Sequence, residues 1–157
     1  MTTREQIDDF LGQRRLVLVG LSRNRKHFSH QVLAAFRRAG HQMSAVNPHG
    51  AEADETPCYA KVDEVASTVD GAILMVPDSG LDAAVRDCLA AGVPRLWISG
   101  VGKGRPISAE TIARCREQGI PVINGYCPLM FLRSASWPHR FHGWVVQHSR
   151  AFKSAPV

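Results

Sequence analysis

The stretch LVLVGLSRNRKHFSHQVLAAFRRAG, residues 16–40, joins an apolar run, a polar loop and an amphipathic segment. Four apolar residues lead into Gly20, a pattern that is typical of a buried strand ending in a turn. After Ser29, apolar residues recur on one helical face: Val32, Leu33 and Phe36. Gly40 then suits the left-handed residue that ends a helix. The stretch therefore predicts a strand, a loop and a helix in immediate succession.

The same alternation continues along the chain. Four more apolar runs follow: MSAVN (43–47), AILMVP (72–77), RLWISG (95–100) and IPVING (120–125). Helical patterns between them end at Gly92 and Gly119, a weaker one covers 61–67, and residues 4–12 predict an extra N-terminal helix. Apolar strands that alternate with helices indicate a parallel sheet covered on both faces. We therefore predict an α/β fold with a Rossmann-like, doubly wound sheet of about five strands.

The chain has 157 residues, of which 45% are hydrophobic and 21% charged, so it suits one domain with an ordinary core. We assign residues 1–133 to this domain. Residues 134–157 are basic and aromatic and lie outside the alternation. They predict a C-terminal extension that packs on the domain or on a partner subunit of a homo-oligomer.

The formal net charge is +5 and the pI is about 9.4. A basic balance favours polyanionic partners: nucleic acid, a phosphorylated small molecule or an acidic membrane. A solvated basic surface is the alternative. The N-terminus has no apolar core of signal-peptide length, and no apolar run reaches the roughly 20 residues of a membrane span. We expect a cytoplasmic protein without a membrane partner, whose four cysteines are reduced thiols.

The ligand site of an open parallel sheet lies outside the carboxyl ends of its strands. In this chain the first such loop holds three cations in four positions, Arg23, Arg25 and Lys26. The helix that follows Ser29 directs its partly positive N-terminus toward the same edge. The loop is therefore predicted to bind phosphate groups, and a loop that is only solvated is the alternative.

Two features of the usual dinucleotide site are missing. The GxGxxG pattern is absent, since only Gly20 stands in GLSRNRK. The second strand ends at Asn47, where an NAD site has an acidic residue for the ribose hydroxyls. NAD is therefore disfavoured, whereas the positive charge leaves NADP open.

Five segments, taken in order, resemble one known family: VLVGLSRNRKHFSHQVLAAFRRAG, SAVNPHG, GAILMVPDS, LWISGVG and GIPVINGYCPLMF. The resemblance is to the CoA-binding domain family, which includes small stand-alone proteins and the N-terminal domain of the succinyl-CoA synthetase alpha subunit. It runs from about residue 14 to residue 132. It implies a Rossmann-like fold that holds CoA along the carboxyl edge of the sheet. The synthetase domain has more glycine in its first loop and a lysine near His49, whereas this chain carries its cations in the first loop.

The resemblance, together with the position of the basic loop, gives a set of expected CoA-binding residues. They are Gly20, Ser22, Arg23, Arg25, Lys26 and Ser29 in the first loop, Asn47, Pro48 and His49 after the second strand, Val76 and Pro77 after the third, and Ser99 and Gly100 after the fourth.

The sequence offers few candidate residues for catalysis or metal binding. Cys127 precedes Pro128 at a predicted helix start, where a helix N-terminus can lower the pKa of a thiol, so Cys127 is a candidate redox-reactive residue. His139 and His142 stand one helical turn apart without an evident third ligand, so we assign no metal site and no catalytic residue.

The sequence thus predicts a protein that binds coenzyme A or an acyl-CoA without catalysis. An NADP-type oxidoreductase and a regulatory module that senses a nucleotide cofactor are the alternatives, and nucleic acid is not favoured.

Overall fold

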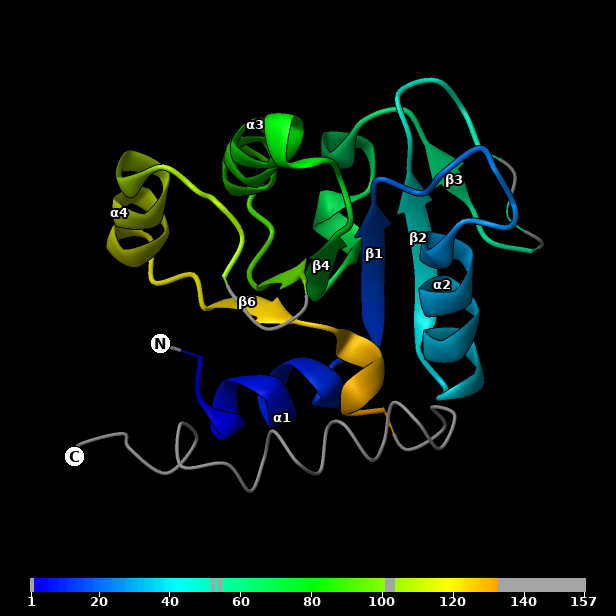
Figure 1. The fold of residues 1–157 in the computed structure, drawn as a ribbon, viewed down its shortest axis with the longest axis horizontal. Coiled ribbons are helices and arrows are strands. Elements are labelled where there is room, and N and C mark those ends of the chain that lie inside the picture. Colours follow the sequence, from blue (N-terminus) through cyan, green and yellow to red (C-terminus); the bar gives the residue numbers. More distant parts are fainter. Residues whose placement is uncertain (1, 52, 54, 101–103, 133–157) are drawn as a thin grey trace.

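The computed structural model describes residues 2–51, 53, 55–100 and 104–132. A six-stranded parallel sheet has the order β3-β2-β1-β4-β5-β6 (Figure 1). The strands are β1 (Arg15–Val19), β2 (Gln42–Val46), β3 (Cys58–Tyr59), β4 (Gly71–Leu74), β5 (Leu96–Ser99) and β6 (Val122–Tyr126). The α-helices are α1 (Arg4–Gly12), α2 (Phe28–Arg38), α3 (Asp78–Ala90) and α4 (Ala109–Glu117). The predicted Rossmann-like fold is confirmed.

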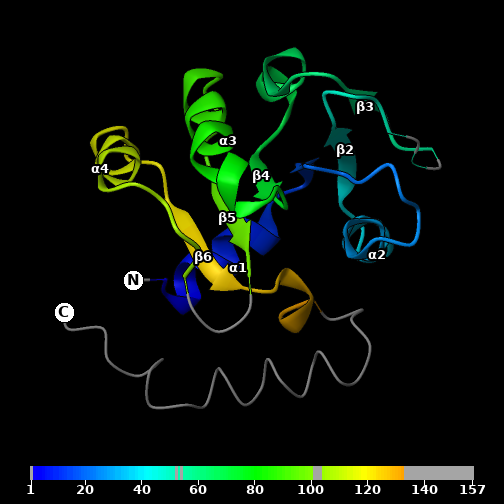
Figure 2. The ribbon, with the colours of Figure 1, turned by 45° about the horizontal axis from the view of Figure 1, so that its top comes forward.

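Helices cover both faces of the sheet (Figure 2). On one face, α1 and α2 pack against the side chains of alternate strand residues such as Leu16, Leu18 and Trp97. On the other face, α3 and α4 pack against their neighbours in the strands, such as Val17 and Leu96. The alternation of side chains along each strand thus divides the core into two layers. Trp97 is fully buried, as its place in an apolar run predicted.

Side-chain caps fix where the helices begin. In α1, the Thr3 hydroxyl accepts the Gln6 N–H at 3.2 Å, and the Gln6 amide oxygen accepts the Thr3 N–H at 2.9 Å. In α4, the Ser108 hydroxyl accepts the Thr111 N–H at 3.1 Å. Each cap satisfies backbone donors that the first turn of a helix leaves unpaired.

Two predictions about the segment between β2 and β4 need correction. The sheet has a sixth strand, β3, of only two residues, which is too short to show an alternating pattern. The segment 61–67, predicted as a weak helix, forms two 3₁₀ turns, η1 (Val62–Glu64) and η2 (Ala66–Thr68). A third, η3 (Pro128–Met130), follows β6. The predicted extension 134–157 lies outside the described residues.

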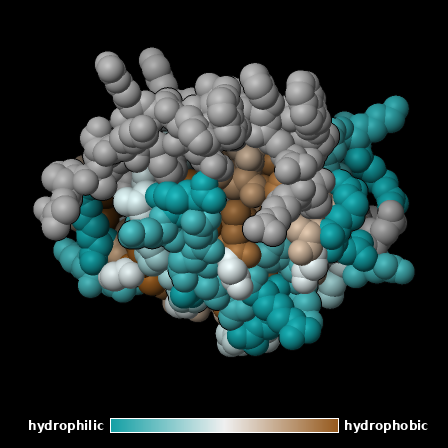
Figure 3. All heavy atoms as spheres, turned by 90° about the horizontal axis from the view of Figure 1, so that it is seen from below, coloured by the Kyte–Doolittle hydropathy of each residue, from teal (hydrophilic) through white to brown (hydrophobic). Residues whose placement is uncertain are grey.

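The surface on the side of α1 carries mostly hydrophilic side chains, with an apolar strip between them (Figure 3). In α1 the charged residues Arg4, Glu5 and Asp8 are exposed while Ile7 and Phe10 are buried against the sheet. Among the described helices, none combines the length and the apolar character needed to cross a bilayer.

Candidate functional site

The carboxyl ends of β1, β2 and β4 meet at Gly20. Its N–H donates to the carbonyl of Val46 at 2.9 Å, and the N–H of Met75 donates to the carbonyl of Val19 at 2.8 Å. Gly20 has a φ of +95°, and a Cβ atom built there would lie 3.0 Å from the Met75 backbone. Only glycine tolerates both the conformation and the close approach.

The loop from Gly20 to α2 is held by its own polar side chains. The buried hydroxyl of Ser29 accepts the Ser22 N–H at 3.1 Å and hydrogen-bonds His27 Nδ1 at 2.9 Å. His30 Nε2 donates to the Ser22 carbonyl at 2.7 Å. Because His27 Nδ1 also accepts the Ser29 N–H, at 3.2 Å, α2 begins at Phe28 and Ser29 lies inside its first turn.

Asn47, which follows β2, connects the loop after Gly20 to the end of that strand through hydrogen bonds. Its Nδ2 donates to the Leu21 carbonyl at 2.6 Å, and its Oδ1 accepts the His49 N–H at 2.7 Å. Asn47 and Ser29 were both predicted to contact the ligand. In the structure their polar atoms hold the loops that surround the site.

The basic loop comprises Arg23, Arg25 and Lys26, which are exposed at the carboxyl edge of the sheet. The turn that carries them is shaped by Asn24, whose Oδ1 accepts the Lys26 N–H at 3.0 Å while its own N–H donates to the Ser22 hydroxyl at 3.1 Å. The cations thus project from a loop whose backbone is fixed beside Gly20.

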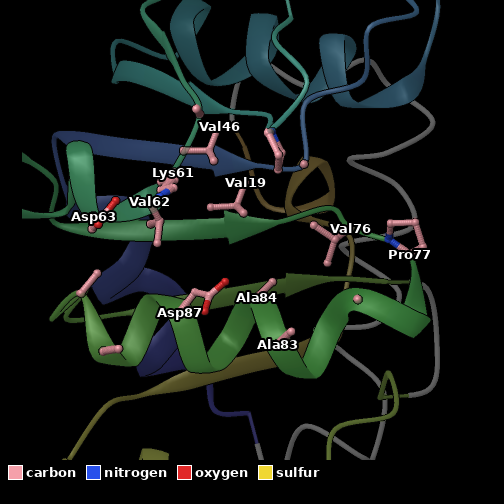
Figure 4. Close-up of a pocket in the computed structure, with 16 residues that line it drawn as sticks. Val19, Val46, Lys61, Val62, Asp63, Val76, Pro77, Ala83, Ala84 and Asp87 are labelled. Atoms are coloured by element: carbon pink, nitrogen blue, oxygen red, sulfur yellow. The ribbon is translucent and has the colours of Figure 1, made fainter.

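A cavity of about 810 Å³ opens at the carboxyl ends of β1, β2 and β4 and extends along α3, beside η1, as far as Ala90 and Ala91 (Figure 4). Its lining comprises Val19, Gly20, Val46, Pro48, Ala60, Lys61, Val62, Asp63, Val76, Pro77, Gly80, Ala83, Ala84, Asp87, Ala90 and Ala91. Apolar walls with a few polar groups, and a volume in the range of about 300–1,000 Å³, are typical of small-molecule sites.

One wall of the cavity is a face of α3 made of small residues. Ala83 and Ala84 lie three and four residues after Gly80, and Asp87 lies four and three residues after them, so all four are on one side of the helix. Short side chains at these positions leave room between the helix and the sheet. Sequence reasoning used the apolar positions of this helix and missed the small ones, although their spacing in SGLDAAVRDCLAAG was a readable signal.

The charged lining of the cavity comes from segments that sequence reasoning left out. Lys61 and Asp63 follow β3, and Asp87 lies on α3 (Figure 4). Val76 and Pro77 lie at the other end of the cavity in this view. The short strand β3 places Lys61 here, and no local sequence pattern indicated that strand.

The structure gathers only part of the predicted set around the cavity. Among the described residues, the predicted ones that line it are Gly20, Pro48, Val76 and Pro77. The basic loop and His49 are exposed nearby on the same edge, and Ser22, Ser29 and Asn47 support the loops. The carbonyl of Ser99 accepts from Arg105 Nη1 at 3.4 Å, and Gly100 packs against the Arg105 side chain.

Cys127 differs from its prediction. It is 5% exposed, and burial raises the pKa of its thiol, although the backbone N–H groups of Leu129 and Met130 lower it in part. The expectation of a lowered thiol pKa is therefore wrong. The helix that follows, η3, has only three residues, so its N-terminus offsets little of the desolvation.

No group of three or more His, Cys, Asp or Glu side chains is arranged to hold a metal ion within the described part of the chain. His27, His30 and His41 all take part in hydrogen bonds of the folded chain. His139 and His142 lie outside the described residues.

The parallel sheet, the glycine turn after β1 and the cavity at the carboxyl edge define a Rossmann-like ligand-binding domain. Residues 14–133 match the family described as CoA binding domain. The chain belongs to this family, and its membership supports CoA binding in general. Among curated proteins, no sequence matches the chain significantly.

Several solved structures share the fold. A conserved hypothetical protein from Pyrococcus furiosus is 25% identical, with a TM-score of 0.61 over 73% of this chain and 95% of that chain. A hypothetical protein from Pyrococcus horikoshii OT3 is 20% identical, with a TM-score of 0.70 over 85% of this chain and 89% of that chain. An acetyl-coenzyme A synthetase 1 from Candidatus Korarchaeum cryptofilum is 23% identical, with a TM-score of 0.63 over 76% of this chain and 27% of that chain.

Proposed function

We propose that this protein binds coenzyme A or an acyl-CoA in the cavity beside Gly20, as a binding protein to which no catalytic step is assigned. The observation that carries the proposal is the position of the cavity. One end of it lies at the carboxyl ends of β1, β2 and β4, and Gly20, which lines it, begins the loop that carries the exposed Arg23, Arg25 and Lys26. Membership of the CoA binding domain family supports the same ligand.

The two parts of the site match the two chemical parts of the ligand. CoA carries a pyrophosphate and a 3′-phosphate, and these groups suit the exposed cations of the basic loop. The rest of the molecule is less charged, and it suits the apolar cavity walls formed by residues such as Val19, Val62 and Ala84. A few charge-assisted hydrogen bonds contribute roughly 1.5–3 kcal/mol each, so micromolar affinity, about −8 kcal/mol, is within reach.

Isothermal titration calorimetry of the full chain with CoA, acetyl-CoA, NAD, NADP and ATP tests the proposal. We expect CoA or acetyl-CoA to bind in the micromolar range and NAD to bind much more weakly. NAD or NADP binding as tight as that of CoA would overturn the assignment. In that case an assay of nicotinamide absorbance with candidate substrates would examine the oxidoreductase alternative.

A further inference from the structure

Arg105 connects three neighbouring strands at the edge of the sheet where the cavity opens. Its Nη2 donates to the Val76 carbonyl at 2.7 Å, beyond the end of β4, and its Nη1 donates to the Ser99 carbonyl at 3.4 Å, at the end of β5. The Arg105 N–H donates to Asn124 Oδ1 of β6 at 2.8 Å, and Asn124 Nδ2 donates to the Arg105 carbonyl at 3.1 Å. The Arg105 side chain is only 18% exposed.

The same guanidinium also pairs with a carboxylate at the start of α3. Arg105 Nε and Nη2 donate to Asp78 Oδ1 at 2.8 and 2.5 Å. Asp78 is the first residue of α3, and its side chain is 62% exposed. Its negative charge therefore stands next to Pro77, which lines the cavity. Arg105 offsets this charge at a place where a polyanionic ligand is expected.

Val76, whose carbonyl accepts a hydrogen bond from Arg105, also lies very close to Gly20. Val76 lines the cavity and is the side chain that a Cβ at Gly20 would meet, at 2.8 Å. A shift of Val76 would change both the cavity wall and the turn after β1. Arg105 itself does not line the cavity, so it acts on the ligand through Val76 and Asp78.

We infer that Arg105 is a positioning residue for the CoA site. It fixes the Val76–Pro77 wall and neutralises Asp78, so that the edge of the cavity accepts a phosphorylated ligand. The inference rests on the proposed function, because it concerns the affinity for CoA. Arg105 is not among the residues predicted to contact CoA. Its effect on CoA affinity can therefore be measured separately from the effect of a direct contact.

The experiment compares two arginines that make similar bonds at opposite edges of the sheet. Arg105→Gln removes the charge at the carboxyl edge. Arg95→Gln is the matched control, because Arg95 Nε donates to Asp9 Oδ2 at 2.6 Å and Arg95 Nη1 donates to the Asp70 carbonyl at 3.3 Å, beside the amino ends of the strands. The Arg95 side chain is 28% exposed. Thermal unfolding and calorimetry with CoA are measured for both variants and the wild type.

We expect both variants to unfold at lower temperature, whereas only Arg105→Gln weakens CoA binding, by at least about fivefold, or roughly 1 kcal/mol. Added Asp78→Asn should restore part of the affinity, because it removes the carboxylate that Arg105 no longer neutralises. Higher salt should reduce the deficit of Arg105→Gln relative to the wild type, because ions screen the exposed Asp78 charge.

The inference fails if Arg105→Gln binds CoA as tightly as the wild type, which would leave Arg105 with a purely structural role. It also fails if Arg95→Gln weakens CoA binding as much as Arg105→Gln does. Should Arg105→Gln not fold, Arg105→Lys keeps the charge and loses the planar fork. It is then expected to bind CoA more weakly than the wild type, and unchanged affinity would overturn the inference. A wild-type protein that does not bind CoA is a failure of the proposed function instead.

Discussion

Gly20 and Val76 lie so close together that a Cβ atom on Gly20 would stand 2.8 Å from Val76 Cγ1. These two residues belong to the ends of different strands, β1 and β4, and both line the cavity. The contact brings the turn after β1 against the wall that leads into α3. The space available to a ligand at this edge is therefore set by the absence of a side chain at Gly20.

The first prediction concerns Gly20→Ala. The added methyl group meets the Met75 backbone at 3.0 Å as well as Val76, and the residue must adopt a φ of +95°. Gly40→Ala is the matched control, because Gly40 has a φ of +97° and nothing within 4 Å of the added atom. We expect Gly40→Ala to cost roughly 1–2 kcal/mol of folding free energy from the backbone alone. Gly20→Ala should cost about 1–3 kcal/mol more, from overpacking, and weaken CoA binding. If urea denaturation shows that Gly20→Ala and Gly40→Ala lose the same folding free energy, the close contact between Gly20 and Val76 does not have this role.

The second prediction concerns the basic loop. Replacing Arg23, Arg25 and Lys26 together with Ala should weaken CoA binding by at least about tenfold, or 1.4 kcal/mol, because we propose that their charges bind the phosphates. Dephospho-CoA lacks the 3′-phosphate, so the triple replacement should reduce its affinity less than it reduces the affinity for CoA. Calorimetry with both ligands measures the difference.

A second triple variant controls for net charge. Arg38, Arg114 and Arg116 are exposed on α2 and α4, and replacing them with Ala removes the same three charges away from the basic loop. This control should leave the affinity for CoA nearly unchanged at physiological salt. If the two triple variants bind CoA alike, the basic loop is only solvated.

The third prediction concerns the wall of small residues on α3. Ala84→Leu adds three carbon atoms to a half-buried position that lines the cavity, so it should weaken CoA binding by about tenfold or more. Ala113→Leu makes the same change at an exposed position of α4 and should leave binding unchanged. Since neither position is fully buried, both variants should keep their folding free energy within about 1 kcal/mol. Unaltered CoA affinity of Ala84→Leu would place the ligand elsewhere.

The fourth prediction concerns the thiols. Burial and the nearby Asp87 carboxylate raise the pKa of Cys88 to about 12, and burial raises the pKa of Cys115 and Cys127 as well. The thiolate is the attacking species in disulfide exchange, so these three cysteines should react slowly in the native protein. Cys58 is half-exposed and should form the first adduct with CoA disulfide near pH 8, as mapped by mass spectrometry. A faster adduct at Cys127 would restore the interpretation of that residue as redox-reactive.

The fifth prediction concerns acid stability. The Arg15 guanidinium hydrogen-bonds Asp70 and holds the pKa of that carboxyl below its usual range. A lowered pKa in the folded state stabilises the protein above the unfolded pKa, near 4, and the contribution is lost as the pH falls through the folded value. Asp70→Asn should therefore destabilise the protein at pH 7 and have less effect below about pH 4. CoA affinity should not change, because Asp70 lies at the amino edge of the sheet. A destabilisation that is constant with pH would contradict this account.

Local sequence patterns predicted most of the fold, because the burial of strands and helices requires such patterns of apolar residues. A strand buried on both faces must be apolar throughout, as LVLV before Gly20 is, and a helix that covers a sheet must repeat its apolar residues at helical spacing. These rules located β1, α2, β4 and β5. They missed β3, since two residues carry no period, and they gave a helix at 61–67 where two 3₁₀ turns form.

By itself, the sequence predicted a ligand site at the carboxyl edge of the sheet, and four of the residues that it named there, Gly20, Pro48, Val76 and Pro77, line the cavity of the structure. Each of these follows directly from the end of a strand, so its position depends only on the alternation of elements.

Only the tertiary structure decided which side chains face the cavity and which support its loops. Lys61 reaches the cavity through a two-residue strand, whereas the polar atoms of Ser29 and Asn47 are taken by neighbouring loop groups. The physical reason is that a hydrogen-bonding partner is chosen by proximity in the folded chain. Arg105 and Val76, or Asn47 and Leu21, are distant in sequence, and no local pattern records such a pair.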